Sequence, residues 1–148
     1  MYAQIDGGSV VAYPVDIWRA HPNVSFPIGW TGGIVEGVEY ALVTPTTRPT
    51  VDYSENVTEG TPSLTGGVWL QVWTVTSASP EEVSARITAQ WSTVREERNR
   101  KLYACDWTQL SDAPLTAEVK AEWVTYRQAL RDITQQADPF AIVWPVEP

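Results

Sequence analysis

The pattern of apolar and polar positions along this chain changes character near residue 78. Before that point, short apolar–polar alternations with a period of two are separated by Gly and Pro residues, as in strands joined by turns. After it, apolar residues recur every three or four positions, which is the spacing of one helix face. The pattern predicts an α+β fold, with a small antiparallel β layer over residues 1–77. A helical region with an extended end is predicted over residues 78–148.

The N-terminal segment is predicted to form a β-hairpin. Residues 2–5 and 9–13 flank Asp6-Gly7-Gly8, a turn whose glycines supply positive φ angles, and Pro14 is expected to end the second strand. Asp16 is suited to cap a one-turn helix over residues 16–20.

Between this hairpin and the next apolar run, residues 24–37 are rich in Gly and Pro. This composition predicts a loop, with Phe26 and Trp30 as its anchors. A strand is expected over residues 38–44, and a Pro-bounded linker over residues 45–49.

Two further strands are predicted over residues 53–61 and 68–76, around the Gly66-Gly67 turn. In the second of them Trp69 and Trp73 share one face, and the opposite face is also apolar. A strand that is apolar on both faces is expected to be covered on both. It is therefore either a central strand beneath a helix or a strand at a subunit contact.

The first long helix has a clear start. Ser79 is suited to be the N-cap, Pro80 the first helical residue and Glu82 the partner in a capping box. Arg98 interrupts the apolar stripe of this helix, where its aliphatic stem can pack while its charge reaches solvent. The remaining stripe positions are Val83, Ile87, Trp91, Val94, Leu102 and Cys105.

A second helix is predicted after Pro114, with Thr116 as its N-cap. Its apolar face consists of Val119, Trp123, Tyr126, Leu130 and Ile133. Because the connection between the helices is short, an antiparallel helical hairpin is expected. Asp106 is expected at the corner, and Trp107 and Leu110 are expected to plug the end of the hairpin.

The chain after the second helix is apolar and extended. Asp138-Pro139 ends the helical pattern, and an apolar strip over residues 140–144 leads to Trp144-Pro145. Such a strip must be covered, either by its own chain or by a partner.

The composition narrows the possible partners. The formal net charge of −8 argues against nucleic acid, which requires clustered Lys and Arg, and against an anionic membrane surface. The single cysteine excludes an internal disulfide. The first residues do not look like a signal peptide, and no apolar run reaches the ~20 residues of a membrane span.

Candidate chemistry is sparse. There is one His and one Cys, far apart in the sequence, so neither a metal site nor a cofactor is expected. A hydrolytic triad would have to use His21, and no nucleophile turn accompanies it. We therefore predict that the protein is not an enzyme.

The residues of the corner and tail occur in an order that resembles a known family. The shared residues are Leu102, Cys105-Asp106-Trp107-Thr108-Gln109-Leu110, Asp112-Ala113-Pro114-Leu115, Trp123, Tyr126-Arg127-Gln128-Ala129-Leu130-Arg131-Asp132-Ile133 and Trp144-Pro145. They resemble the phage tail assembly chaperone family over residues 98–148, and the tail-fibre assembly proteins are similar in outline. Family members often carry Pro after Arg-Asp-Ile. Thr134 stands there instead, so the second helix is expected to run slightly longer.

The resemblance implies help in assembling tails or tail fibres, without ATP and without catalytic residues. Its shared positions imply a scaffold, formed by Asp106, Trp107, Trp123, Tyr126, Arg127 and Arg131. Arg127 and Arg131 are expected to pair with Asp106 or Asp112.

The expected partner is a phage tail-fibre or baseplate subunit, trimeric, with apolar strands that would otherwise aggregate. The candidate partner-binding residues are Trp69, Trp73, Trp144 and Pro145. The protein is expected to act in the host cytoplasm during assembly, and both a homo-oligomer and retention in the virion stay open. Two alternatives are a permanent structural subunit of the virion tail and a sugar-binding or sugar-cleaving tail module.

Overall fold

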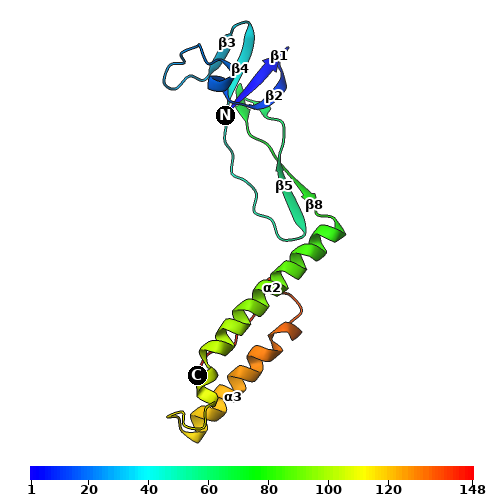
Figure 1. Cartoon of the computed structure of the whole chain (residues 1–148). Helices are drawn as coiled ribbons and strands as arrows, with labels where there is room; N and C mark the ends of the chain where they lie inside the picture. The colour runs from blue at the N-terminus through cyan, green and yellow to red at the C-terminus, as the bar shows by residue number, and fades with distance from the viewer. The chain divides into compact units, whose positions relative to one another are not determined.

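The computed structural model describes all 148 residues, which divide into two compact units, Met1–Ser77 and Ala78–Pro148. The first unit contains the strands and one short helix, and the second contains the long helices (Figure 1). The predicted mixed α+β class is therefore confirmed. None of the helices is both long enough and apolar enough to cross a lipid bilayer.

A six-stranded sheet forms the body of the first unit. Its strand order is β2-β1-β4-β7-β6, and β3 also pairs with β4. All pairs are antiparallel except β4 with β7. The strands are β1 (Tyr2–Asp6), β2 (Ser9–Val15), β3 (Gly32–Val35), β4 (Val38–Thr44), β6 (Ser63–Thr65) and β7 (Val68–Leu70).

The first hairpin forms around the predicted glycine turn, and Gly7 and Gly8 both have positive φ angles. The expectation that Pro14 ends the second strand is wrong, because β2 continues to Val15. β2 is an edge strand of the sheet, and edge strands tolerate proline better than central strands do.

The prediction of a loop throughout residues 24–37 is wrong for its second half, which contains β3. Gly32 lies so close to β4 that an added Cβ would be 2.4 Å from the carbonyl oxygen of Tyr40. The glycine that looked like a loop residue thus permits close strand approach. The anchoring role of Phe26 and Trp30 is confirmed, because both pack against Tyr2 and its buried neighbours.

Each face of this sheet has its own apolar cluster. On one face, the core residues are Tyr2, Ile17 and Tyr40. Ile17 belongs to the short helix α1 (Ile17–Ala20), which Asp16 caps as predicted by accepting from the N–H groups of Trp18 and Arg19. On the other face, the buried residues are Ala3, Ile5 and Val43.

The predicted continuous strand over residues 68–76 is wrong. The chain pairs with the large sheet as β7, and then with β5 (Glu55–Glu59) as β8 (Trp73–Ser77) in a separate two-stranded sheet. Gln71 is buried at the break, where its N–H donates to the Thr44 carbonyl at 2.9 Å.

The broken strand also lacks the expected cover on both faces. Val68 is 47% exposed and Val75 is 42% exposed, so this is not a central strand buried by the rest of the chain. Because β7 and β8 belong to different sheets, Trp69 and Trp73 do not share the face of one strand. The alternative of a strand at a subunit contact stays a prediction.

The second unit contains α2 (Pro80–Ala104), η1 (Asp106–Gln109), α3 (Ala117–Arg131) and η2 (Asp132–Gln135). Both predicted helix starts are confirmed. The Ser79 hydroxyl accepts from the Glu82 N–H at 3.2 Å, and the Glu82 carboxylate accepts from the Ser79 N–H at 2.8 Å. Thr116 caps α3 by accepting from the Val119 N–H. Beyond Arg131 the helical turns continue only as η2.

The core of the second unit lies where α2 and α3 meet. Its buried residues are Cys105, Trp123, Tyr126 and Leu130, and Leu102, Leu115, Val119 and Trp144 pack against them. Four of the five residues predicted for the apolar face of α3 are buried; the exception, Val119, is half-buried. In α2 only Val94 is buried, although the predicted stripe runs along most of that helix.

Candidate functional site

Arg127 joins three elements of the second unit at the corner between α2 and α3. Its side chain is buried, and its Nη1 donates to the Leu102 carbonyl at 2.9 Å and lies 3.0 Å from the Cys105 Sγ. Its Nη2 donates to the Asp106 carboxylate at 2.8 Å. One side chain of α3 thereby holds the last turn of α2 and the first residue of η1.

The charge on Arg127 is maintained despite its burial. Burial by itself disfavours a charged guanidinium, but the hydrogen bonds to Asp106 and Cys105 raise the pKa of Arg127 above its usual value. The predicted pairing of Arg127 with Asp106 is thus confirmed. Arg131 is exposed and pairs with neither Asp106 nor Asp112, so that part of the prediction is wrong.

The corner is filled by a different residue from the two expected. Trp107 is 47% exposed and Leu110 is 57% exposed, whereas Thr108 is only 1% exposed. Side chains three residues apart align in a 3₁₀ turn, so Cys105 and Thr108 share the inner side while Trp107 and Leu110 share the outer one. The expectation that Trp107 and Leu110 plug the corner is therefore wrong.

Trp123 and Tyr126 are placed inside the core. The Trp123 ring makes an edge contact with Tyr126 at a centroid distance of 5.7 Å, and another with Trp107 at 6.3 Å. The buried rings of Trp123 and Tyr126 and the half-exposed ring of Trp107 therefore form one aromatic group that reaches from the core to the surface.

The chain after η2 lies against the helices of its own unit. The Gln90 amide donates to the Pro139 carbonyl at 3.2 Å, and the Gln136 side chain bonds both the N–H and the carbonyl of Val143. Trp144 packs on the core of the unit, with the Lys101 ammonium 5.5 Å from its ring centroid. Pro145 lines an open cavity of about 410 Å³ beside Tyr126.

Residues 91–148 match the family model of the phage tail assembly chaperone protein. This segment, called the chaperone domain below, is similar to the phage tail assembly chaperone proteins. It contains most of α2, the corner, α3 and the final strip, and therefore the contacts of Arg127, Trp123 and Trp144 described above. No match was found among curated proteins or among solved structures.

The family model does not extend to residues 1–90, which include the other two candidate partner-binding residues, Trp69 and Trp73. Trp69 is half-buried and packs on the Ala3, Ile5 and Val43 cluster. Trp73 is also half-buried: its ring N–H donates to the Thr46 carbonyl at 3.4 Å, and the Arg48 guanidinium lies 5.8 Å from its ring centroid. The structure does not bring the two rings together on one surface.

The two-stranded sheet of β5 and β8 is exposed along most of β8. Its register runs from Glu55 opposite Ser77 to Glu59 opposite Trp73, and no further strand pairs with either member. Figure 1 shows the two strands side by side, apart from the strands of the large sheet. Residues 74–77 are all exposed.

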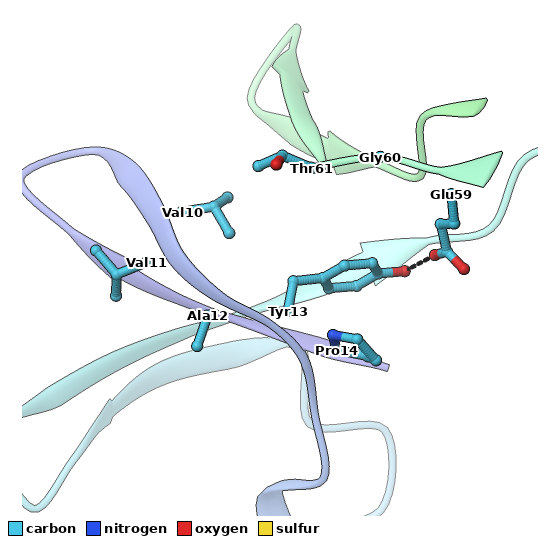
Figure 2. Close-up of a pocket in the computed structure, with 8 residues that line it drawn as sticks. All are labelled: Val10, Val11, Ala12, Tyr13, Pro14, Glu59, Gly60 and Thr61. Carbon is cyan, nitrogen blue, oxygen red and sulfur yellow. Dashed lines mark hydrogen bonds between the residues drawn. The ribbon is translucent and has the colours of Figure 1, made fainter. Parts of the chain in front are cut away.

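An open cavity of about 630 Å³ separates β2 from residues 59–61 (Figure 2). The Tyr13 hydroxyl donates to the Glu59 carboxylate across it, and the Gln71 amide donates to the same carboxylate at 2.8 Å. These bonds lower the pKa of Glu59, whereas burial and the neighbouring Glu59 raise the pKa of Tyr13 to about 12. The sequence alone does not reveal this site, because Tyr13 and Glu59 are 46 positions apart in the chain.

His21 is bonded at both ring nitrogens. Its Nδ1 lies 2.7 Å from the Glu36 carboxylate, and its Nε2 lies 3.0 Å from the Tyr40 hydroxyl. Tyr40 is itself buried, so its hydroxyl is not presented to a substrate. The arrangement ties the end of α1 to the β3–β4 turn and to β4, which is a structural role.

Proposed function

We propose that this protein assists the assembly of phage tails or tail fibres by binding a tail-fibre or baseplate subunit, without catalysis. The observation that carries the proposal is the chaperone domain at residues 91–148, which supports a role in tail assembly. Such a protein acts in the infected host cell while tails are being built. The partner in this proposal is a trimeric subunit with strands that are unprotected before assembly.

The β5–β8 sheet is the surface we assign to the partner. An isolated pair of strands is marginally stable in water, and unpaired strand edges are templates for further pairing. No further strand of the chain pairs with β8, and residues 74–77 are exposed. A partner strand that adds to β8 would stabilise the pair and cover an edge of the partner at the same time.

Trp73 and Trp69 support this surface from its inner end. Trp73 lies opposite Glu59 at the end of the β5–β8 register, where its bond to the Thr46 carbonyl fixes the start of β8. Trp69 anchors the preceding β7 on the large sheet. In this proposal both residues contribute to partner binding by setting the direction of the strand.

For the chaperone domain we propose a rigid antiparallel pair of α2 and α3, closed by the extended tail. Arg127 fixes the corner, and Trp144-Pro145 returns the chain to α3. The two units are proposed to work as separate domains, residues 1–77 and 78–148. The tail keeps exposed apolar side chains at Phe140, Val143 and Val146 for contact with the partner.

A matched pair of substitutions tests where the partner binds. Val75→Lys places a charge on exposed β8, and Val124→Lys does the same on an exposed position of α3. After co-expression with a tagged fibre subunit, Val75→Lys should reduce the amount of protein recovered on the tag, and Val124→Lys should not. Equal recovery of both variants would refute the β8 surface, and loss with Val124→Lys alone would move the interface to the helices.

A further inference from the structure

We propose that the cavity between β2 and residues 59–61 binds a basic side chain, Lys or Arg, from an extended segment of a protein partner. Its wall contains Val10, Val11 and Pro14 on one side and Gly60 and Thr61 on the other, with Glu59 at one end (Figure 2). A long aliphatic stem would lie against the apolar wall, and the cationic head would reach the carboxylate.

The Glu59 carboxylate is held in place before any ligand arrives. Tyr13 holds it from β2, and Gln71 holds it from the break between β7 and β8. A carboxylate has about four lone-pair sites, so two donors leave acceptor capacity for a third group. Gln71 is itself buried and fixed, because its carbonyl accepts from the Thr46 hydroxyl and its side-chain oxygen accepts from the Thr46 N–H.

The charge at this site lacks a counterion within the chain. Tyr13 and Gln71 are neutral donors, and none of the ion pairs in the structure includes Glu59. The hydrogen bonds lower the pKa of Glu59, which keeps its carboxylate ionised at neutral pH. The net charge of −8 attracts a cationic segment over a longer range.

The neighbouring strand explains why the ligand should be an extended peptide. β2 is the outermost strand of its sheet and pairs only with β1. An extended segment that adds to its free edge would satisfy backbone groups, while one side chain enters the adjoining cavity, as in other β-augmented complexes. The hydrogen bond from the Tyr13 hydroxyl to Glu59 joins β2 to the cavity wall that residues 59–61 form.

This inference rests on the proposed function for the nature of the partner, a tail protein, but it uses a surface other than the edge of β8. A failure here would leave the β8 surface intact, and the Val75→Lys experiment would decide that surface separately. The two proposals are therefore distinguishable.

The test is a titration of the ¹⁵N-labelled full chain with the blocked peptide Val-Thr-Arg-Thr-Val, followed by backbone amide shifts. The control peptide carries citrulline in place of Arg, which keeps the shape and removes the charge. The Arg peptide should shift the amides of residues 10–13 and 59–61, and the citrulline peptide should bind about tenfold more weakly. Equal binding of both peptides, shifts confined to other residues, or no saturable shift at millimolar peptide would overturn the proposal.

Two variants complete the experiment. Glu59→Gln retains the size of the side chain and removes the charge, so affinity for the Arg peptide should fall about tenfold. Glu39→Gln, at an exposed position of β4, should leave the affinity unchanged. Unperturbed amide spectra of both free variants show that they are folded, and unchanged affinity of a folded Glu59→Gln variant contradicts the proposal.

Discussion

Replacing Trp123 by Ala tests how much this side chain contributes to the core of the chaperone domain. Trp123 is 8% exposed in α3 and touches both Tyr126 and Trp107 through ring edges. Its side chain also belongs to the cluster of Cys105 and Leu130. The substitution would remove the largest aromatic side chain of this core and leave a cavity.

The size of the effect follows from burial. A Trp side chain buries about 150–250 Å², which corresponds to about 4–6 kcal/mol at about 25 cal/mol per Å². Partial collapse of the cavity and residual burial in the unfolded chain reduce this figure, so the expected loss is about 3–5 kcal/mol. Trp107 is 47% exposed, so Trp107→Ala should cost only about 1–2 kcal/mol.

The assay is urea unfolding of the full chain, followed by the far-UV helical signal, because nearly all helical residues lie in the second unit. Fluorescence is less suitable, since the chain has eight Trp residues in both units. If the two variants lose the same stability, or if Trp107→Ala loses more, then Trp107 fills the corner and the placement of Thr108 inside it is incorrect.

Three further predictions concern the chaperone domain. Arg127→Lys should lower its stability by about 1–3 kcal/mol in the same urea assay, because an ammonium cannot bond Leu102, Cys105 and Asp106 together; full stability would mean that these bonds contribute nothing. Removal of residues 138–148 should lower the melting temperature of the helical signal, since Pro139 and Trp144 lie against the helices. An unchanged melting temperature together with lost partner binding would instead place the tail in an interface. The hydrogen bond from Arg100 lowers the pKa of Glu97 from 4.5 to about 2. The stability that this pair contributes is therefore present above pH 4.5 and is lost as the pH falls toward 2. Glu97→Gln should flatten that part of the profile of stability against pH, and an unaltered profile would contradict the pairing.

The features that sequence analysis predicted well depend on residues close together in the chain. Ser79, Pro80 and Glu82 define a helix start within four positions, and Thr116 does so for α3. The Asp6-Gly7-Gly8 turn likewise fixes a hairpin without help from distant residues. In each case the deciding hydrogen bonds or backbone angles lie within a short segment. The structure of that segment can therefore be predicted before the fold is known.

The features that it missed depend on contacts between distant residues. The alternating pattern around Gln71 is continuous, but this residue bonds Thr44 and Thr46, and the strand breaks there. The start of η1 is likewise held by Arg127, which bonds the Asp106 carboxylate from 21 positions away in the chain. Local periodicity contains no information on either contact.

The candidate sites show the same division. The corner residues Asp106, Trp123, Tyr126 and Arg127 were found because they occur in a recognisable order. The Tyr13–Glu59 site was not, since neither residue stands in a motif and the bond spans 46 positions. Only the arrangement of β2 beside residues 59–61 reveals it.

Co-expression with the tail-fibre or baseplate protein of the same phage would show whether this protein assists tail assembly by binding a tail subunit. The measurement is the soluble fraction of that protein with and without this chain, together with its recovery as a complex. If this chain protects the tail subunit, the soluble fraction should be larger and a complex should be recovered when the chain is present. A fibre or baseplate protein that is equally soluble in both cases and never recovered with this chain would contradict it.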